Sequence, residues 1–173
     1  MIILSLGSNL KSKFGNRFDN LIYAMSFLEE KGVKIDKRSS FFETPSYPDK
    51  KNPKFINIVI SINTNLSINN LIDLIIFAEE KLGRKRIRKN DPRTCDIDII
   101  DYKNEVLNFE YKKSFFSIPH GQLSKRNFVL YPLKEILPDW KHPKTKESID
   151  SLIQKLSDDD RKSILKVKKN WYS

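Results

Sequence analysis

The chain has 173 residues, of which 39% are hydrophobic and 31% are charged, and this composition indicates a soluble globular protein with one buried core. No apolar run approaches the roughly 20 residues of a membrane-spanning helix, so no membrane partner is expected. The one cysteine, Cys95, excludes an internal disulfide and a cysteine-rich zinc site, and it favours a reducing, cytoplasmic compartment. The formal net charge of +10 favours anionic partners such as nucleic acid, lipid or phosphorylated small molecules.

The first third of the chain predicts three strands and a helix. Ile2–Leu6 is a short β-rich run rather than a signal peptide, and a turn composition begins at Gly7. Val33–Phe42 and Phe55–Asn63 are predicted strands, separated by a polar loop with three prolines. Between the first two strands, apolar residues at three- and four-residue spacing predict a helix that ends at Gly32. Its apolar positions are Phe18, Leu21, Ile22, Met25 and Leu28.

The next elements complete a recognisable order. A second helix is predicted from the N-cap Ser67 to Gly83, and a strand follows at Cys95–Ile100. The order strand, helix, strand, strand, helix, strand is the split βαβ, or ferredoxin-like, arrangement. We therefore expect an α+β three-layer sandwich, with a mainly antiparallel sheet and helices on its faces, as one domain over residues 1–173. The last third adds a predicted hairpin and two helical stretches, at Glu105–Ser117, Phe128–Leu137 and Ile149–Leu156.

The pair Asp96 and Asp98 is the sharpest chemical feature. Side chains alternate along a strand, so the two carboxylates face the same way, with Cα atoms about 7 Å apart. Carboxylates at this separation can share two divalent cations about 3.5–4 Å apart. Magnesium fits better than zinc because oxygen ligands dominate. Repulsion between the two like charges predicts a cationic partner nearby. The alternative is a strand whose outer face simply meets water.

A basic loop precedes that strand. The segment from Lys81 to Arg93 contains seven Lys or Arg residues and one acid, Asp91, and so carries a net charge of +6. Arginines bind phosphate oxygens in a bidentate manner. Carboxylates that hold metal beside arginines are what phosphoryl transfer requires, because charge develops on the non-bridging oxygens. The sequence has no glycine-rich P-loop, so nucleotide binding of another kind is expected. A solvated basic loop is the alternative.

Aromatic and amide residues form a third feature. Phe55 with Asn57, and Phe128 after Arg126, could hold a flat heteroaromatic ligand by stacking and by hydrogen bonds from the amide. Taken singly, each phenylalanine reads more simply as a core residue. His120 lies in a loop, where a structural role is the simpler interpretation, although it could donate to a phosphate.

These motifs occur in the order of a known family. The sequence resembles the 6-hydroxymethyl-7,8-dihydropterin pyrophosphokinase family of folate biosynthesis from Leu4 to about Trp140. The blocks that carry the resemblance are SLGSNL, SSFFETPSYP, FINIVI, AEEKLGRKR, PRTCDIDII, NEVLNF and IPHGQLSKRNFVLYPL.

The resemblance implies a ferredoxin-like fold and a transfer reaction. Pyrophosphate would move from ATP, the co-substrate, to the hydroxymethyl oxygen of 6-hydroxymethyl-7,8-dihydropterin, and AMP would be released. Two Mg²⁺ ions held by Asp96 and Asp98 are implied, as is the absence of a nucleic-acid partner. We also expect a monomer. Arg84 and Arg93 are implied to act with the two aspartates as catalytic residues.

The resemblance also implies two binding sets. The pterin would lie between the rings of Phe55 and Phe128, with its polar edge read by Asn57 and with further pocket positions at Thr44 and Pro45. The ATP set would include the backbone of Ile99. Its other members are Glu79, Arg84, Arg86, Arg93, Ser117, His120 and Arg126.

Two other classes of protein use similar parts. A nucleotidyl transferase or polymerase palm also has a strand-borne pair of aspartates and two metals, but it needs a further carboxylate from a neighbouring strand. Ile2–Leu6 contains no such carboxylate. A basic nucleic-acid-binding module of this topology would carry exposed aromatic residues on its central strands. There, Asp96 and Asp98 would repel a phosphate backbone unless a metal intervened.

Overall fold

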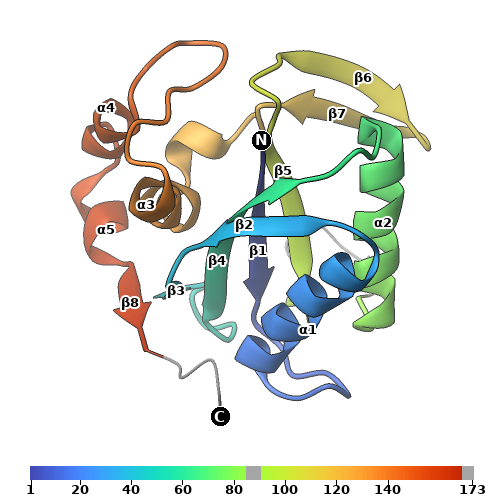
Figure 1. Cartoon of the computed structure of the whole chain (residues 1–173). Helices are drawn as coiled ribbons and strands as arrows, with labels where there is room; N and C mark the ends of the chain where they lie inside the picture. The colour runs from blue at the N-terminus through green and yellow to red at the C-terminus, as the bar shows by residue number, and fades with distance from the viewer. Residues whose placement is uncertain (85–90, 169–173) are drawn as a thin grey trace.

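The computed structural model describes residues 1–84 and 91–168, and a six-stranded sheet lies at the centre of the fold (Figure 1). Every strand pairing in this sheet is antiparallel. The strand order is β5-β1-β4-β3-β8, and β2 also pairs with β4. The strands are β1 (Ile2–Ser8), β2 (Lys34–Arg38), β3 (Phe41–Thr44), β4 (Phe55–Asn63), β5 (Asp96–Tyr102) and β8 (Leu165–Val167).

Helices cover both faces of the sheet. On one face lie α1 (Arg17–Glu30) and α2 (Ile68–Lys81), and on the other lie α3 (Asn127–Ile136) and α4 (Ile149–Gln154). This arrangement confirms the predicted α+β three-layer sandwich. The remaining elements are the hairpin β6 (Leu107–Tyr111) and β7 (Ser114–Ile118), the short 3₁₀ helix η1 (Leu123–Lys125), and α5 (Asp158–Lys162), which leads into β8.

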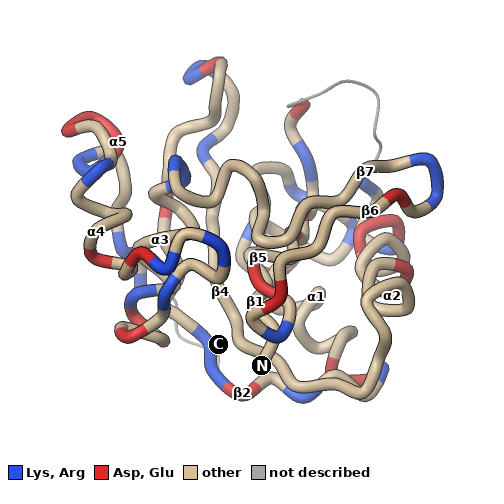
Figure 2. The backbone as a smooth tube through the Cα atoms, turned by 90° about the horizontal axis from the view of Figure 1, so that it is seen from above, with Lys and Arg blue, Asp and Glu red and all other residues tan. Residues whose placement is uncertain are grey.

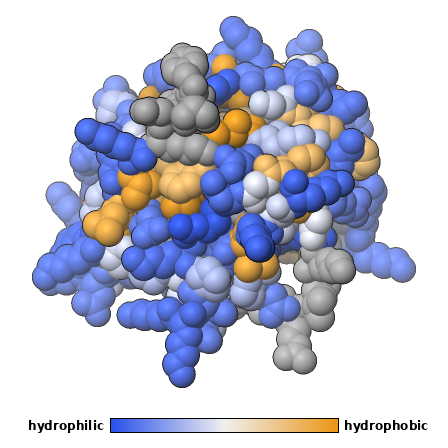
Figure 3. Space-filling view, turned by 90° about the horizontal axis from the view of Figure 1, so that it is seen from below, coloured by the Kyte–Doolittle hydropathy of each residue, from blue (hydrophilic) through white to orange (hydrophobic). Residues whose placement is uncertain are grey.

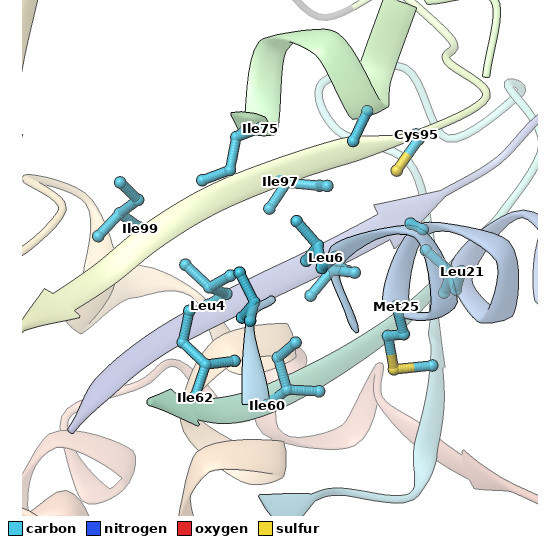
Figure 4. Packing of buried hydrophobic residues seen from close by; sticks show 14 of the residues in the cluster. Leu4, Leu6, Leu21, Met25, Ile60, Ile62, Ile75, Cys95, Ile97 and Ile99 are labelled. Carbon is cyan, nitrogen blue, oxygen red and sulfur yellow. The ribbon is translucent and has the colours of Figure 1, made fainter. Parts of the chain in front are cut away.

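Strand alternation divides the core into two layers. Leu4 and Leu6 of β1 pack with Ile97 and the two helices α1 and α2 (Figure 4). Ile3 points to the opposite face, where it packs with Val59 and Ile100 against α3 and α4. Since both faces are covered, most of the central strands are apolar on both sides. Most polar residues of these strands lie near the carboxyl end of β1, where they form the site described below.

The predicted helix boundaries follow from local signals. Asn16 caps α1 in a reciprocal capping box with Asp19, and Gly32 follows the helix with a φ of +84°. Ser67 caps α2 through its Oγ, which accepts from the Asn70 N–H at 3.3 Å. Gly83, with a φ of +81°, follows the end of α2, as predicted.

The structure corrects two predicted strands. β1 continues through Gly7 and Ser8, where a turn was predicted, because both residues pair with β4. Val33–Phe42 is not one continuous strand, because the regular pairing is interrupted at Ser39 and Ser40 between β2 and β3, although the Ser39 N–H still donates to the Val59 carbonyl. The Ser39 hydroxyl accepts from the Val59 N–H at 3.1 Å and donates to the Ser40 carbonyl at 2.7 Å. These side-chain bonds accompany a shift in register, so that Arg38 is paired with Ile60 but Phe42 with Asn57 of the same strand β4.

Most charged residues lie on the outside of the fold, with Glu79 and Asp101 as buried exceptions. Figure 2 shows Lys and Arg spread over loops and helices around the molecule, with acidic residues among them. On the face in Figure 3, hydrophobic surface is broken up by hydrophilic residues. No helix within residues 1–84 and 91–168 is long and apolar enough to cross a membrane.

Candidate active site

Two rows of residues cross three neighbouring strands on the face that α3 and α4 cover. Gly7 of β1 is paired with Asn57 of β4 on one side and with Asp96 of β5 on the other. Ser5, the next residue of β1 on this face, is paired with Asp98 of β5. Directly paired residues of a sheet point to the same face. The predicted metal pair and the predicted pterin-reading amide therefore share one polar surface.

Gly7 makes this closeness possible. A Cβ atom at Gly7 would lie 3.1 Å from the Asn57 Oδ1 and 3.5 Å from a ring carbon of Phe55. A larger residue would push these two side chains away, so the absence of a side chain opens the space between Asn57 and Asp96.

Three arginines balance the two aspartates. Arg84 Nη1 lies 2.7 Å from one Asp96 oxygen, and Arg93 Nε lies 2.8 Å from the other. Arg126 Nη1 donates to Asp98 Oδ2 at 2.7 Å. The side chains of the aspartates remain 20% and 30% exposed, so a ligand can reach both. The cationic partner expected from the repulsion of like charges is present.

Glu79 holds the Arg84 side chain in place. Its carboxylate is almost fully buried on α2, where it accepts from the Ile97 N–H at 2.8 Å and forms an ion pair with Arg84. Burial alone would lower the pKa of Arg84, but the carboxylates of Asp96, Glu79 and Asp98 outweigh it and raise this pKa above its ordinary value. Arg84 is thus a permanent cation held at the base of the site.

The start of α3 forms another side of the site. The Arg126 guanidinium lies 5.5 Å from the centroid of the Phe128 ring. His120 Nδ1 accepts from the Gln122 N–H at 3.1 Å, which leaves Nε2 to carry the proton of the neutral ring. Burial lowers the pKa of His120, an effect that the charge of Asp98 partly opposes. His120 is therefore a neutral donor close to the aspartates.

The predicted pterin residues form the opposite side. Asn57 Nδ2 donates to the Thr44 hydroxyl at 3.0 Å and to the Phe42 carbonyl at 3.4 Å, so its orientation is fixed before any ligand arrives. The Phe55 ring lies 5.3 Å from the Arg93 guanidinium carbon. This contact joins the pterin side to the phosphate side.

For several predicted site residues, the structure gives a location but no contact that tests their role. Pro45 is half-buried beside Thr44, and Ser117 is exposed on β7. The Ile99 side chain is buried in the core, so only its backbone can face a ligand. Arg86 lies outside the described residues. The ligand roles of all these residues stay predictions.

The sequence interpretation gave no role to Asn9, although the structure places it at a junction. Its Oδ1 accepts from the Arg93 N–H at 2.7 Å. Its Nδ2 donates to the Ser46 hydroxyl at 3.2 Å and to the Pro53 carbonyl at 3.1 Å. Asn9 thus joins the loop after β3 to Arg93. The only signal in the sequence is its place at the end of the Gly-Ser-Asn run, which was predicted to be a turn and which the structure shows to be the last two residues of β1 followed by Asn9.

The donor set fits magnesium. Across the parts of the chain that the structure describes, no three or more His, Cys, Asp and Glu residues cluster as a closed metal site. Asp96 and Asp98 offer hard oxygen ligands on one face, and Mg²⁺ is usually bound through one or two carboxylates, with phosphates and water as its other ligands. Burial raises the pKa of the nearby Cys95 thiol well above its ordinary range, so sulfur does not compete.

Comparison with known proteins decides the family. The family model described as 7,8-dihydro-6-hydroxymethylpterin-pyrophosphokinase (HPPK) matches residues 3–138. The chain belongs to this family. A 2-amino-4-hydroxy-6-hydroxymethyldihydropteridine pyrophosphokinase of Aquifex aeolicus is 37% identical over 142 residues, which cover 82% of this chain and 83% of that protein. The corresponding Synechocystis enzyme is 33% identical over 155 residues, or 89% of this chain and 75% of that protein.

Longer proteins contain a similar part. The chain is 35% identical over 164 residues to the folic acid synthesis protein fol1 of Pneumocystis carinii, and this match covers 95% of the chain but only 21% of that protein. The crystal structure of wild-type Plasmodium falciparum HPPK-DHPS has a TM-score of 0.66 at 17% identity, and the match covers 87% of this chain and 43% of that one. At this identity the likeness shows the HPPK fold alone.

Proposed function

We propose that the chain transfers the pyrophosphoryl group of ATP to the hydroxymethyl oxygen of 6-hydroxymethyl-7,8-dihydropterin and releases AMP. Family membership supports the reaction, and one observation carries the site: Asp96 and Asp98 lie on one face of β5, within reach of three guanidinium groups. The hydroxymethyl oxygen forms a bond to the β-phosphorus, and the bond from that phosphorus to the oxygen of the α-phosphate breaks.

Asp96 and Asp98 are proposed to hold two Mg²⁺ ions. The ions would supply positive charge to the ATP phosphates and to the attacking oxygen. In the structure both carboxylates are engaged by arginines, so the arginines must exchange carboxylate for phosphate oxygens as the substrates bind. Arginine suits this exchange because its planar fork fits carboxylate and phosphate equally well.

The three arginines are proposed to have different roles, because different side chains hold them in place. Arg84 is fixed by Glu79 and stays at the base of the site. Arg93 and Arg126 each lie against a phenylalanine ring, so their positions are coupled to the ring system of the pterin. These guanidinium groups neutralise charge that develops on the phosphate oxygens. His120, neutral with its proton on Nε2, donates to a phosphate oxygen.

The pterin is proposed to lie between Phe55 and Phe128. The Thr44 hydroxyl holds Asn57 in one orientation, so its amide can match the donor and acceptor edge of the heterocycle without reorganisation. Because Asn57 and Asp96 flank Gly7, a pterin read by Asn57 brings its hydroxymethyl group toward the metal-binding carboxylates.

The remaining expectations belong to the same proposal. We propose that residues 1–173 form one domain that works as a monomer without nucleic acid. The neutral thiol of the buried Cys95 is compatible with a reducing cytoplasm.

The test is a reconstituted reaction. Protein, ATP, Mg²⁺ and 6-hydroxymethyl-7,8-dihydropterin are mixed and AMP is measured, with parallel reactions that lack the pterin or contain EDTA. AMP that appears only in the complete mixture supports the proposal. A folded protein that releases no AMP contradicts it.

A further inference from the structure

The helix α3 begins between two residues of the site. Arg126 is its N-cap residue and Phe128 lies in its first turn. The Arg126 guanidinium donates to Asp98, and because it has no acceptor atom it cannot cap the N–H groups of the first turn. The orientation of this first turn therefore determines where the Arg126 guanidinium and the Phe128 ring lie. Because the first turn has no side-chain cap, other contacts must fix its orientation.

Asn127, between these residues, points the other way. Its side chain is buried, and Nδ2 donates to the Asp160 carbonyl at 2.6 Å and to the Ser163 hydroxyl at 3.0 Å. The Ser163 hydroxyl in turn donates to the same Asp160 carbonyl at 3.1 Å. Both amide hydrogens of Asn127 are thus used by α5 and the residue that ends it. Figure 1 shows α5 beside α3.

The same terminal segment also reaches the pterin side. After Ser163 the chain forms β8, which pairs with β3 in the register Phe42 with Lys166. β3 also contains Thr44, whose hydroxyl accepts from Asn57. Residues 157–167 therefore contact α3, which begins at Arg126, and β3, whose Thr44 holds Asn57 of the neighbouring strand β4. This segment lies beyond residues 3–138, to which the family model matches.

We propose that Asn127 is a positioning residue and that residues 157–167 act as a clamp that aligns the start of α3 with β3. The clamp holds Arg126 and Phe128 at a fixed distance from the Thr44–Asn57 pair, so both halves of the site are formed before substrates bind. The clamp rests on the proposed function only for the identity of the ligands. Small misplacements of groups in an active site cost up to about 100-fold in rate, so loss of the clamp has a measurable effect.

The test compares Asn127→Ala with Ser148→Ala. Ser148 caps α4 by accepting from the Ser151 N–H at 3.2 Å, so its loss destabilises the same region without touching the start of α3. Both variants are studied well below their unfolding midpoints. Calorimetry measures binding of the pterin in the presence of Mg²⁺ and α,β-methylene ATP, in which the scissile bond is replaced, and kinetics measure kcat and KM.

The clamp predicts that Asn127→Ala weakens pterin binding about tenfold and lowers kcat, while Ser148→Ala changes neither. Ser163→Ala should give a smaller loss, and the double variant should lose less than the two single losses combined, because both act through one contact. Unchanged binding and turnover in Asn127→Ala, or equal losses in Ser148→Ala, contradict the clamp. Turnover by the unmodified chain tests the proposed function separately, since the binding comparison decides the clamp even where no AMP forms.

Discussion

Arg126 donates to Asp98 at 2.7 Å although 28 residues separate them in the chain. Asp98 lies on the central sheet and Arg126 at the start of a helix that packs on it. The same guanidinium lies over the Phe128 ring. One side chain therefore links the carboxylate proposed to hold metal to the ring proposed to stack on the pterin, and this link would join the two substrates of the proposed reaction.

Replacement of Asp98 by alanine tests the metal assignment. We expect turnover to fall at least about 100-fold, because the variant lacks a carboxylate that would hold the Mg²⁺ ions, and these cations would neutralise the negative charge of the transition state. The fold should survive, since the Asp98 side chain is partly exposed at the site. Asp36→Ala on β2, which removes a surface ion pair with Lys34, is the matched control. Full activity in the Asp98 variant would rule out the metal site.

Replacement of Arg93 separates phosphate contact from pterin binding. We expect Arg93→Ala to lower kcat more than it raises the KM for the pterin, because its charge faces Asp96 and the phosphate side. Arg93→Lys should recover part of the activity, since lysine keeps the charge but loses the planar fork. If AMP release by Arg93→Ala is unchanged, Arg93 has no place in the phosphate site.

Gly7→Ala should weaken pterin binding about tenfold, which corresponds to about 1.4 kcal/mol. The added methyl group would lie 3.1 Å from the Asn57 Oδ1, which is tighter than an ordinary contact, so the Asn57 amide must shift from its position beside Thr44 by a few tenths of an ångström. Gly121→Ala is the control because nothing lies within 4 Å of a Cβ there and its φ is not positive. Titration of each variant with the pterin would settle the matter, and equal affinities would remove Gly7 from the pocket.

The pH dependence of stability tests the environment of His120. Burial lowers its pKa from the ordinary value of 6.5, so the unfolded chain binds more protons than the folded chain just below pH 6.5. The stabilising contribution is complete above pH 6.5 and is lost as the pH falls toward the folded-state pKa. Urea unfolding of ligand-free protein at several pH values should therefore show a flatter profile for His120→Gln.

A residual slope is expected in that variant, because burial also lowers the pKa of His142. An identical slope in the variant and in the unmodified chain would show that His120 is not buried in its neutral form.

Alternation and periodicity predicted much of the fold and the relation of Asp96 to Asp98. They work because a strand has two faces and a helix one apolar stripe. The break at Ser39 escaped prediction, since it depends on a hydroxyl bonded to a neighbouring strand. α5 and β8 escaped as well, because the residues of α5 carry charge without an apolar stripe and β8 is only three residues long.

The site was predictable in part for a similar reason. Repulsion between the two aspartates predicted a cationic partner, and the resemblance to the family indicated which arginines provide it. The roles of Asn9 and Asn127 did not follow, because a buried amide has no periodic signature and its partners lie far away in the chain.

Phosphorus-31 NMR of the complete reaction tests the central claim most directly. Transfer of pyrophosphate predicts that AMP and a pterin diphosphate form in a one-to-one ratio. The unmodified chain and Asp36→Ala should form them at similar rates, and Asp98→Ala should form both far more slowly. Formation of ADP and a pterin monophosphate, or the full AMP signal from Asp98→Ala, would contradict the proposed pyrophosphoryl transfer at Asp96 and Asp98.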